Sequence, residues 1–414
     1  MGRTMTGVQS SDVFLGDAHV GFLAQGDDGH LRFEYQSDWC VRGWPLSISL
    51  PLRSAPDPVK ATNWFRQLLP DPDVCRRIAD HIDVSLANEG GLLKELAGDA
   101  PGSIHVAHGV GDNNGEGSSY RPLNEHELHE LLFLTQQRPL LAGVENVHLL
   151  LAGSGDKLPL FCDGVRLYVP LGDSFSSHIV RFQPDLASEA LENEAFCMML
   201  ARAMGLPVVD CQLRDGVDRL LLVERIDRAV RDGQVQCLHQ ETFCQALGLP
   251  PGRFFEQEGG ASLKDCFELL RHYSIRPAVD IRALLDWVIF TTLIGASGSH
   301  AGRLALLLSA DGPYLAPFSG ICCTIWRSGG RAAMAIGGCY EYEALGERHW
   351  RVLAEETGIH FRLIRQRLCL FADRLLPAGR ATAETFRRQY GESHSLGQII
   401  ATLMSAAGTL SWLK

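Results

Sequence analysis

"IRALLDWVIFTTLIGASGSHAGRLALLLSADGPYLAPF", residues 281–318, is the stretch that decides the fold. Apolar residues repeat with helical spacing in its first part and stop at Gly295, which predicts a helix ending there. The segments 304–308 and 314–318 flank the turn Ala310-Asp311-Gly312 and predict a β-hairpin with an exposed turn. Between helix and hairpin lies the loop GASGSHAGR (295–303), which carries a histidine and two serines but no acidic residue.

The chain before this stretch is predicted to be rich in strands, and the chain after it to be helical. Strands are expected near Leu158, Tyr168 and His178 and over 220–223, with one helix over 191–204 between them. Helices are expected again over 347–376 and from 395 to the end. A β-rich lobe followed by a helical lobe that contains a loop, a hairpin and a second loop is the plan of a protein-kinase-like fold.

The first hundred residues predict a separate small α+β domain. Short alternating runs around the turn Gly16-Asp17, at 31–35 and at 46–50 predict strands, and 61–69 and 92–96 predict helices. A polar, glycine-rich segment follows, and Asn124 with Glu127 predicts a capping box at the start of the next helix. We therefore divide the α+β chain into an N-terminal domain (10–107), a linker (108–123), an N-lobe (124–235) and a helical C-lobe (236–414).

Composition excludes several classes of protein. The chain has 414 residues, of which 46% are hydrophobic, and a net charge of -11, which argues against binding nucleic acid by general electrostatics. No apolar run is long enough for a membrane span, and the start lacks a signal-peptide pattern. The 12 cysteines form no C-x-x-C pair, which favours reduced core thiols over a metal site. These features predict a cytoplasmic protein.

Several blocks in the same order resemble the HipA family, bacterial serine/threonine protein kinases that serve as toxins of toxin–antitoxin pairs. The similarity runs over nearly the whole chain and implies a two-lobed kinase-like fold behind an N-terminal α+β domain. The blocks are LSISLPLR (46–53), WFRQLLPD (64–71), LLAGSGDKLPL (150–160), ENEAF (192–196), VERIDR (223–228), HQETFCQALGLPP (239–251), LAPF (315–318) and MAIGG (334–338).

The resemblance implies an ATP site and names its residues in this chain. Ala152, Gly153 and Lys157 fall in the loop that would contact phosphates. Arg181 and Glu194 stand where the family has a lysine–glutamate pair, and the segment from Glu224 to Ile226 would present its backbone to adenine. An ordinary turn at 152–153 is the structural alternative to a phosphate loop.

The departures from the family pattern lie in the two loops that perform the reaction. The catalytic aspartate falls on Gly298, and the metal-binding asparagine falls on Arg303. The aspartate that holds magnesium falls on Gly320, so no protein metal ligand is expected. His300 remains, and we expect it to pack and to form hydrogen bonds. Three further replacements stand at Gly302 (for lysine), Leu150 (for an autophosphorylated serine) and Thr242 (for aspartate).

These losses bear directly on phosphoryl transfer, which needs a positioned base and charge neutralisation by metal ions. A general base alone contributes on the order of 10²–10⁴ in rate. Glycine supplies no ligand and arginine supplies only positive charge. Relative to the family, the loops lose two negative charges and a lysine and gain an arginine, which leaves them more positive by the charge of one magnesium ion. We therefore predict that Arg181, Arg303 and Lys157 hold a nucleotide or other anion without metal, the alternative being a cleft filled by its own side chains.

The sequence thus predicts a HipA-like pseudokinase that acts by binding a protein. The resemblance implies a helix-turn-helix antitoxin as partner, DNA contact only through that partner, no membrane, and an oligomer formed through the partner. Two alternatives stay open. One is an active kinase toxin that recruits magnesium through the phosphates and phosphorylates a translation-related protein, and the other is nucleotidyl transfer on the same scaffold.

Overall fold

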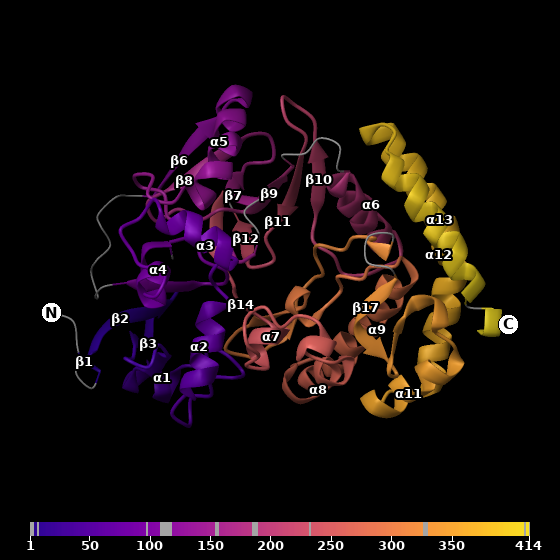
Figure 1. The fold of residues 1–414 in the computed structure, drawn as a ribbon, viewed down its shortest axis with the longest axis horizontal. Coiled ribbons are helices and arrows are strands. Elements are labelled where there is room, and N and C mark those ends of the chain that lie inside the picture. The colour runs from indigo at the N-terminus through magenta and orange to yellow at the C-terminus, as the bar shows by residue number, and fades with distance from the viewer. Residues whose placement is uncertain are drawn as a thin grey trace.

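The computed structural model describes residues 4–5, 8–96, 98–107, 118–153, 157–183, 189–231, 233–325, 330–409 and 411–413. Figure 1 shows the N-terminal domain at one end of the molecule and the long C-terminal helices at the other, with strands between them. No helix among the described residues is long and apolar enough to cross a membrane.

The N-terminal domain is an antiparallel sheet covered by short helices. The sheet runs β1-β2-β3-β4. The strand β5 also pairs with β2, along residues 12–15. Asp57 caps the second helix, and Pro58 suits its first turn because a proline there removes no helical hydrogen bond. Phe65 of that helix packs on Phe33 of the sheet. The elements are β1 Thr4–Met5, β2 Val8–Leu15, β3 Ala18–Gln25, β4 Leu31–Tyr35, α1 Ser37–Arg42, α2 Pro58–Arg66, α3 Pro72–Ala79, α4 Glu89–Leu96 and β5 Ile104–Ala107.

The strand predicted over 46–50 is wrong. Ser47 and Leu50 face each other across a tight turn, with Leu50 N–H donating to the carbonyl of Ser47. Leu46 and Leu50 are buried, as the alternation suggested, but the backbone between them bonds to a side chain instead of a strand. The carboxylate of Glu241 accepts from the Ile48 N–H at 3.1 Å and replaces a neighbouring strand as partner.

The N-lobe is built on a six-stranded antiparallel sheet with the order β10-β11-β9-β7-β8-β6. Its edge strand β6 lies in the segment that we predicted as linker, because residues 119–123 pair with β8, while 108–117 lie outside the described residues. The predicted capping box of Asn124 and Glu127 is present at the start of α5. The elements are β6 Ser119–Leu123, α5 Glu125–Gln137, β7 Lys157–Cys162, β8 Leu167–Leu171, β9 His178–Phe182, α6 Ala190–Ala203, β10 Cys211–Arg214, β11 Leu220–Glu224, β12 Arg228–Arg231 and β13 Gln234–Cys237.

The C-lobe contains the helix, loop and hairpin of the opening stretch. The helix is α9, and the hairpin β15–β16 gains β14 as a third strand, so the lobe is not purely helical. Asp311 in the hairpin turn is exposed, as predicted. The elements are β14 His239–Thr242, α7 Phe243–Ala246, α8 Leu263–Tyr273, α9 Pro277–Leu293, β15 Ala305–Leu308, β16 Tyr314–Leu315, β17 Arg331–Ile336, β18 Cys339–Glu341, α11 Glu347–Thr357, α12 Phe361–Tyr390 and α13 His394–Thr409.

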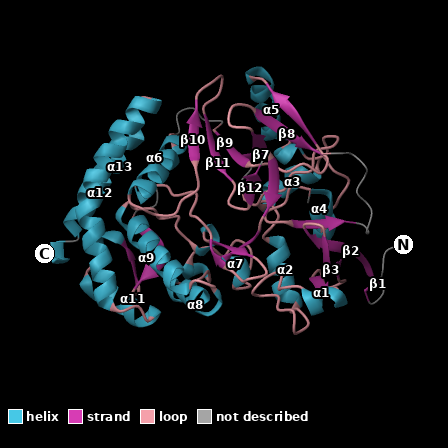
Figure 2. Ribbon diagram, turned by 180° about the vertical axis from the view of Figure 1, so that it is seen from behind, coloured by secondary structure: helices cyan, strands magenta, loops and turns pink. Residues whose placement is uncertain are grey.

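Two apolar cores hold these parts together. One spans α6 and the C-lobe helices, and the other joins the N-terminal domain to the inner face of the N-lobe sheet. Figure 2 shows the same arrangement from behind, with α6 beside α12 and α13, and the N-terminal sheet on the far side of the β7–β11 sheet. The N-terminal domain is therefore packed into the molecule as part of its core.

The described residues also include five single-turn 3₁₀ helices: Pro139–Leu141, Glu256–Glu258, Ala301–Arg303, Tyr342–Ala344 and Ser411–Leu413.

Candidate nucleotide cleft

An open cavity of about 800 Å³ lies where the N-terminal domain, the N-lobe and the C-lobe meet. This volume is within the range of small-molecule sites. The alternative interpretation of the sequence, a cleft filled by its own side chains, is therefore wrong. Predicted site residues that line it are Ala152, Gly153, Lys157, Glu224, Ile226, His300 and Arg303.

The loop before β7 lines the cleft through Ala152 and Gly153. Gly153 has φ +95°, a conformation that favours glycine, and a Cβ built there would lie 3.1 Å from the Lys157 ammonium. The carbonyl of Gly153 accepts from the Asp71 N–H at 3.1 Å, so the N-terminal domain holds this loop. Leu150, at the family's serine position, is fully buried.

Lys157 and Arg181 lie side by side on two neighbouring strands of the N-lobe sheet. In the antiparallel pairing of β7 with β9, the backbone of Lys157 is in register with that of Arg181. Arg181 forms an ion pair with Glu194 of α6, whose side chain is 3% exposed. The pairing predicted between the two residues is thus confirmed. Glu194 thus neutralises the charge of Arg181, and Arg181 is not among the residues that line the cavity.

The segment after β11 forms the back of the cleft. Glu224 N–H donates to the carbonyl of Asp210 at 2.9 Å, and Arg225 N–H donates to that of Ser177 at 3.0 Å. The N–H of Ile226 makes no hydrogen bond to any described residue. Burial raises the pKa of the Glu224 carboxyl, and Asp210 adds to the rise. Ile226 is half-buried and lines the cleft, so an unsatisfied backbone N–H lies beside the cavity.

The loop GASGSHAGR sits at the mouth of the cleft with no carboxylate of its own. Its start is fixed because Thr324 N–H donates to the carbonyl of Gly295, and Ser297 N–H donates to the Thr324 hydroxyl, both at 3.0 Å. A Cβ built on Gly298 would meet no atom within 4 Å. The position of the family's base is therefore open space that a larger side chain would fit.

Arg303 takes up the space beside the second lost carboxylate. Its guanidinium donates to the carbonyl of Gly320 at 3.0 Å. Gly320 has φ +65°, and a Cβ built there would lie only 2.6 Å from the Arg303 nitrogen Nη1. The arginine side chain thus stands where a side chain at 320 would begin. Among the described residues, no three His, Cys, Asp or Glu side chains gather closely enough to hold a metal ion together.

His300 packs against an aromatic ring instead of joining a catalytic group. It stacks on Phe254 with ring centroids 4.7 Å apart and an interplanar angle of 26°. Burial, with a further effect of Arg303, lowers the pKa of His300 to about 4, so the imidazole is neutral at pH 7. The packing role that we expected is present. The expected side-chain hydrogen bond is not seen in the described structure, where Nδ1 is buried without a partner.

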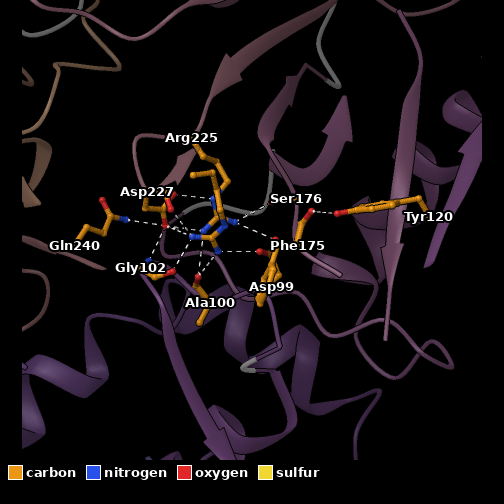
Figure 3. Close-up of polar contacts among 10 residues, drawn as sticks. Asp99, Ala100, Gly102, Tyr120, Phe175, Ser176, Arg225, Asp227 and Gln240 are labelled. Carbon is orange, nitrogen blue, oxygen red and sulfur yellow. Dashed lines mark hydrogen bonds and ion pairs between the residues drawn. The ribbon is translucent and has the colours of Figure 1, made fainter. Parts of the chain in front are cut away.

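Asp227 of VERIDR is among the residues that line the cleft, and it belongs to a buried ion-pair cluster. It accepts from Arg225 at 2.9 Å and lies 2.9 Å from a guanidinium nitrogen of Arg228. Asp99 of the N-terminal domain faces the same two arginines (Figure 3). Despite complete burial, the two guanidinium groups hold the pKa of Asp227 far below its usual range. Asp227 is thus a structural ion-pair partner of two arginines.

Comparison with known proteins identifies the family. The family model of the HipA N-terminal domain matches residues 11–107, and that of the HipA-like C-terminal domain matches residues 149–378. The chain belongs to the HipA family. It is 35% identical to Y4mE of Sinorhizobium fredii over 91% of each chain, a protein whose name assigns it a kinase role only provisionally.

Other members of the HipA family resemble this chain more distantly. A Shewanella oneidensis protein named serine/threonine-protein kinase toxin HipA is 26% identical over 74% of this chain and 73% of its own. A solved structure from the Shewanella oneidensis MR-1 toxin–antitoxin system, containing HipA, HipB and operator DNA, matches with a TM-score of 0.83 at 22% identity, covering 96% of both chains. This match establishes the two-lobed kinase-like fold.

Sequence reasoning missed the contribution of the N-terminal domain to the cleft. Gln67, Leu69 and Asp71 line it, as does Phe254 of the C-lobe. Thr242, at a family aspartate position, also lines it and caps α7 through its hydroxyl. No motif or periodicity marks these residues as site residues, because they reach the cleft through the packing of distant segments. The block WFRQLLPD marked the domain but not its place beside the cleft.

Proposed function

We propose that this HipA-family protein is a pseudokinase that binds a nucleotide or another polyanion in its cleft without metal and acts by binding a protein partner. The observation that carries the proposal is the placement of Arg303. Its guanidinium bonds to the backbone of Gly320, between the two loops where the family holds its base and its magnesium. A fixed positive charge there serves the electrostatic task of a metal ion but offers no ligand for one.

The remaining cleft supports anion binding by the same logic. Lys157 and Arg303 both line the cavity, one from the N-lobe and one from the C-lobe. The unpaired N–H of Ile226 would donate to an adenine ring, and Gly153 lets the loop backbone approach phosphates. The chain therefore keeps the groups that hold a nucleotide and lacks the groups that activate a hydroxyl nucleophile.

A calorimetric titration of ATP tests the binding part of the proposal. We expect binding in the presence of EDTA, and an affinity that added magnesium changes little. Absence of heat with and without magnesium would contradict the proposal. Strict dependence on magnesium would contradict its metal-free part, and the matched variant Arg303→Ala is expected to weaken the metal-free binding.

Labelled ATP tests the loss of reaction and separates the alternatives. We expect no transfer of label to protein from either the γ- or the α-phosphate. Transfer from the γ-phosphate that Arg181→Ala abolishes would establish an active kinase, and transfer from the α-phosphate would establish nucleotidyl transfer. Either outcome would overturn the pseudokinase proposal.

The partner that we propose is a helix-turn-helix antitoxin of the HipB kind, with DNA contacted through it. The support is the family membership and the Shewanella complex, which contains HipA, HipB and operator DNA. Gel filtration of the chain with such an antitoxin from the same genome tests this, and elution of the two proteins separately at micromolar concentration would contradict it. We place the protein in the cytoplasm on the same grounds.

A further inference from the structure

One cluster of buried charges joins the N-terminal domain to the wall of the cleft. Arg225, Asp227 and Arg228 follow β11, and Asp99 comes from the segment that precedes β5. All four side chains are 2% exposed or less. Two arginines and two aspartates give the cluster no net charge, which is the condition under which buried ions are tolerated.

Every donor of Arg225 is engaged. Its guanidinium donates twice to Asp227, once to Asp99 at 3.0 Å, once to the Ser176 hydroxyl at 3.0 Å and once to the carbonyl of Ala100 at 3.1 Å (Figure 3). A guanidinium has five N–H groups, and five hydrogen bonds use all of them. The guanidinium of Arg225 is thus anchored at five points, and this restrains the backbone that carries it.

Arg225 lies between Glu224 and Ile226 in the back wall of the cleft, and all three residues line the cavity. A residue whose side chain is fixed by five hydrogen bonds also restrains the peptide groups on either side of it. The N–H of Ile226, proposed to meet the base, is therefore oriented by contacts that reach into the N-terminal domain.

Asp99 also reaches the opposite wall. Its backbone N–H donates to the carbonyl of His148 at 2.8 Å, and it forms a bridge with Leu149. These residues lead into the loop of Gly153. The side chain of Asp99 holds Arg225 and Arg228, and its main chain holds the start of the loop, so one residue contacts the supports of both walls.

We infer that Asp99 is a positioning residue of the cleft, which sets the distance between the glycine loop (148–153) and the back wall (223–227) and thereby makes the N-terminal domain part of the nucleotide site. This inference rests on the proposed function only for its ligand. The arrangement of the two walls is a property of the unliganded protein. Preorganisation of this kind raises affinity by removing the cost of ordering the site.

Hydrogen exchange of the full chain without ligand tests the arrangement. Asp99→Asn keeps the size of the side chain but removes the charge that pairs with both arginines. We expect faster amide exchange at 223–227 and, to a smaller degree, at 148–153. The matched control is Asp286→Asn, which breaks the half-buried pair with Arg367 in the C-lobe and touches neither wall.

Equal amide exchange at 223–227 and 148–153 in the two variants would overturn the inference. A uniform increase of exchange over the whole chain in Asp99→Asn would overturn it as well. Arg228→Lys serves if Asp99→Asn does not fold, because lysine keeps the charge but cannot reach Asp99, Ala100 and Gly102 together. We expect it to loosen the same two segments, and exchange like that of the control would count against the inference.

Calorimetry with ATP in EDTA then connects the arrangement to binding. We expect Asp99→Asn to raise the Kd about tenfold and Asp286→Asn to leave it unchanged. An unchanged Kd in Asp99→Asn would show that the site does not depend on this residue. Absence of binding by the unaltered protein would contradict the proposed function instead, and the exchange experiment would still decide the role of Asp99.

Discussion

Two regions of this protein place arginine in opposite settings. At the domain junction, Arg225 and Arg228 are buried and each faces two aspartates. At the mouth of the cleft, Arg303 is exposed and donates to the carbonyl of Gly320. The first setting uses the charge of arginine to hold the chain together, whereas the second leaves the charge available to a ligand. The same residue type is therefore structural where carboxylates are present, and we propose that it is functional where the family's carboxylates are missing.

The largest effect is expected where the junction loses one charge. Asp227→Ala leaves two buried guanidinium groups with one carboxylate, and removing one partner of a buried pair costs about 3–5 kcal/mol. Urea unfolding monitored by circular dichroism measures the loss. The exposed pair of Asp28 and Arg32 is the control, since Asp28→Ala is expected to cost under about 1 kcal/mol. Similar losses in the two variants would contradict the structural role of the cluster.

The pH dependence of stability separates paired from unpaired carboxylates at the same junction. The folded pKa of Asp227 lies below its ordinary value of 3.8, so its contribution to stability is present above that pH and is lost as the pH falls below it. Glu241 is buried with only neutral donors, from Ser47, Ile48 and Trp64, and burial raises its pKa from 4.5 to about 7. Its contribution has the opposite sign: it is complete below pH 4.5 and is lost as the pH rises through about 7.

Glu241→Gln tests this sign. The rise in the pKa of Glu241 corresponds to roughly 3 kcal/mol. We expect the stability of the unaltered protein to fall relative to the variant by an amount of this order between pH 5 and pH 8. The measurement is urea unfolding at several pH values. A constant difference between the two proteins over this range would show that Glu241 does not titrate there.

Arg303 gives a smaller effect, on binding instead of stability. Arg303→Ala removes a charged donor from the cleft, and we expect the Kd for ATP in EDTA to rise about tenfold, which corresponds to about 1.4 kcal/mol. Arg253 is a matched control, because it is also exposed and also donates to a backbone carbonyl, that of Glu258, at 3.0 Å. Equal weakening by Arg253→Ala would mean that overall charge, and not the place of Arg303, decides binding.

The smallest effect is expected at Gly298. Its Cβ position is open and its φ is not positive, so Gly298→Asp should change the free energy of unfolding by no more than about 0.5 kcal/mol. Gly320→Asp makes the comparison, because φ +65° and the nearby Arg303 should cost it about 1–2 kcal/mol. Thermal unfolding measures both variants. A large loss at 298 and none at 320 would reverse our description of the two loops.

The sequence by itself determined the order of the elements and the identity of the missing groups. Helical periodicity in α9, the glycine at 295 and the turn at 310–312 are local signals, because backbone conformation responds to neighbouring residues. The pairing of Arg181 with Glu194 was also predicted, through the family pattern. A glycine at 298 or 320 cannot carry a carboxylate in any fold, so the losses needed no structure to be seen.

Only the tertiary structure decided what surrounds these residues. The strand expected at 46–50 became a turn because Glu241, almost two hundred residues away, bonds to its backbone. Asp99 contacts Arg225 across 126 residues of sequence, and Arg303 contacts Gly320 from another loop. Such contacts depend on how packed segments bring distant atoms together, which no local pattern encodes. The sequence therefore shows which carboxylates are missing, and packing decides which groups stand in their place.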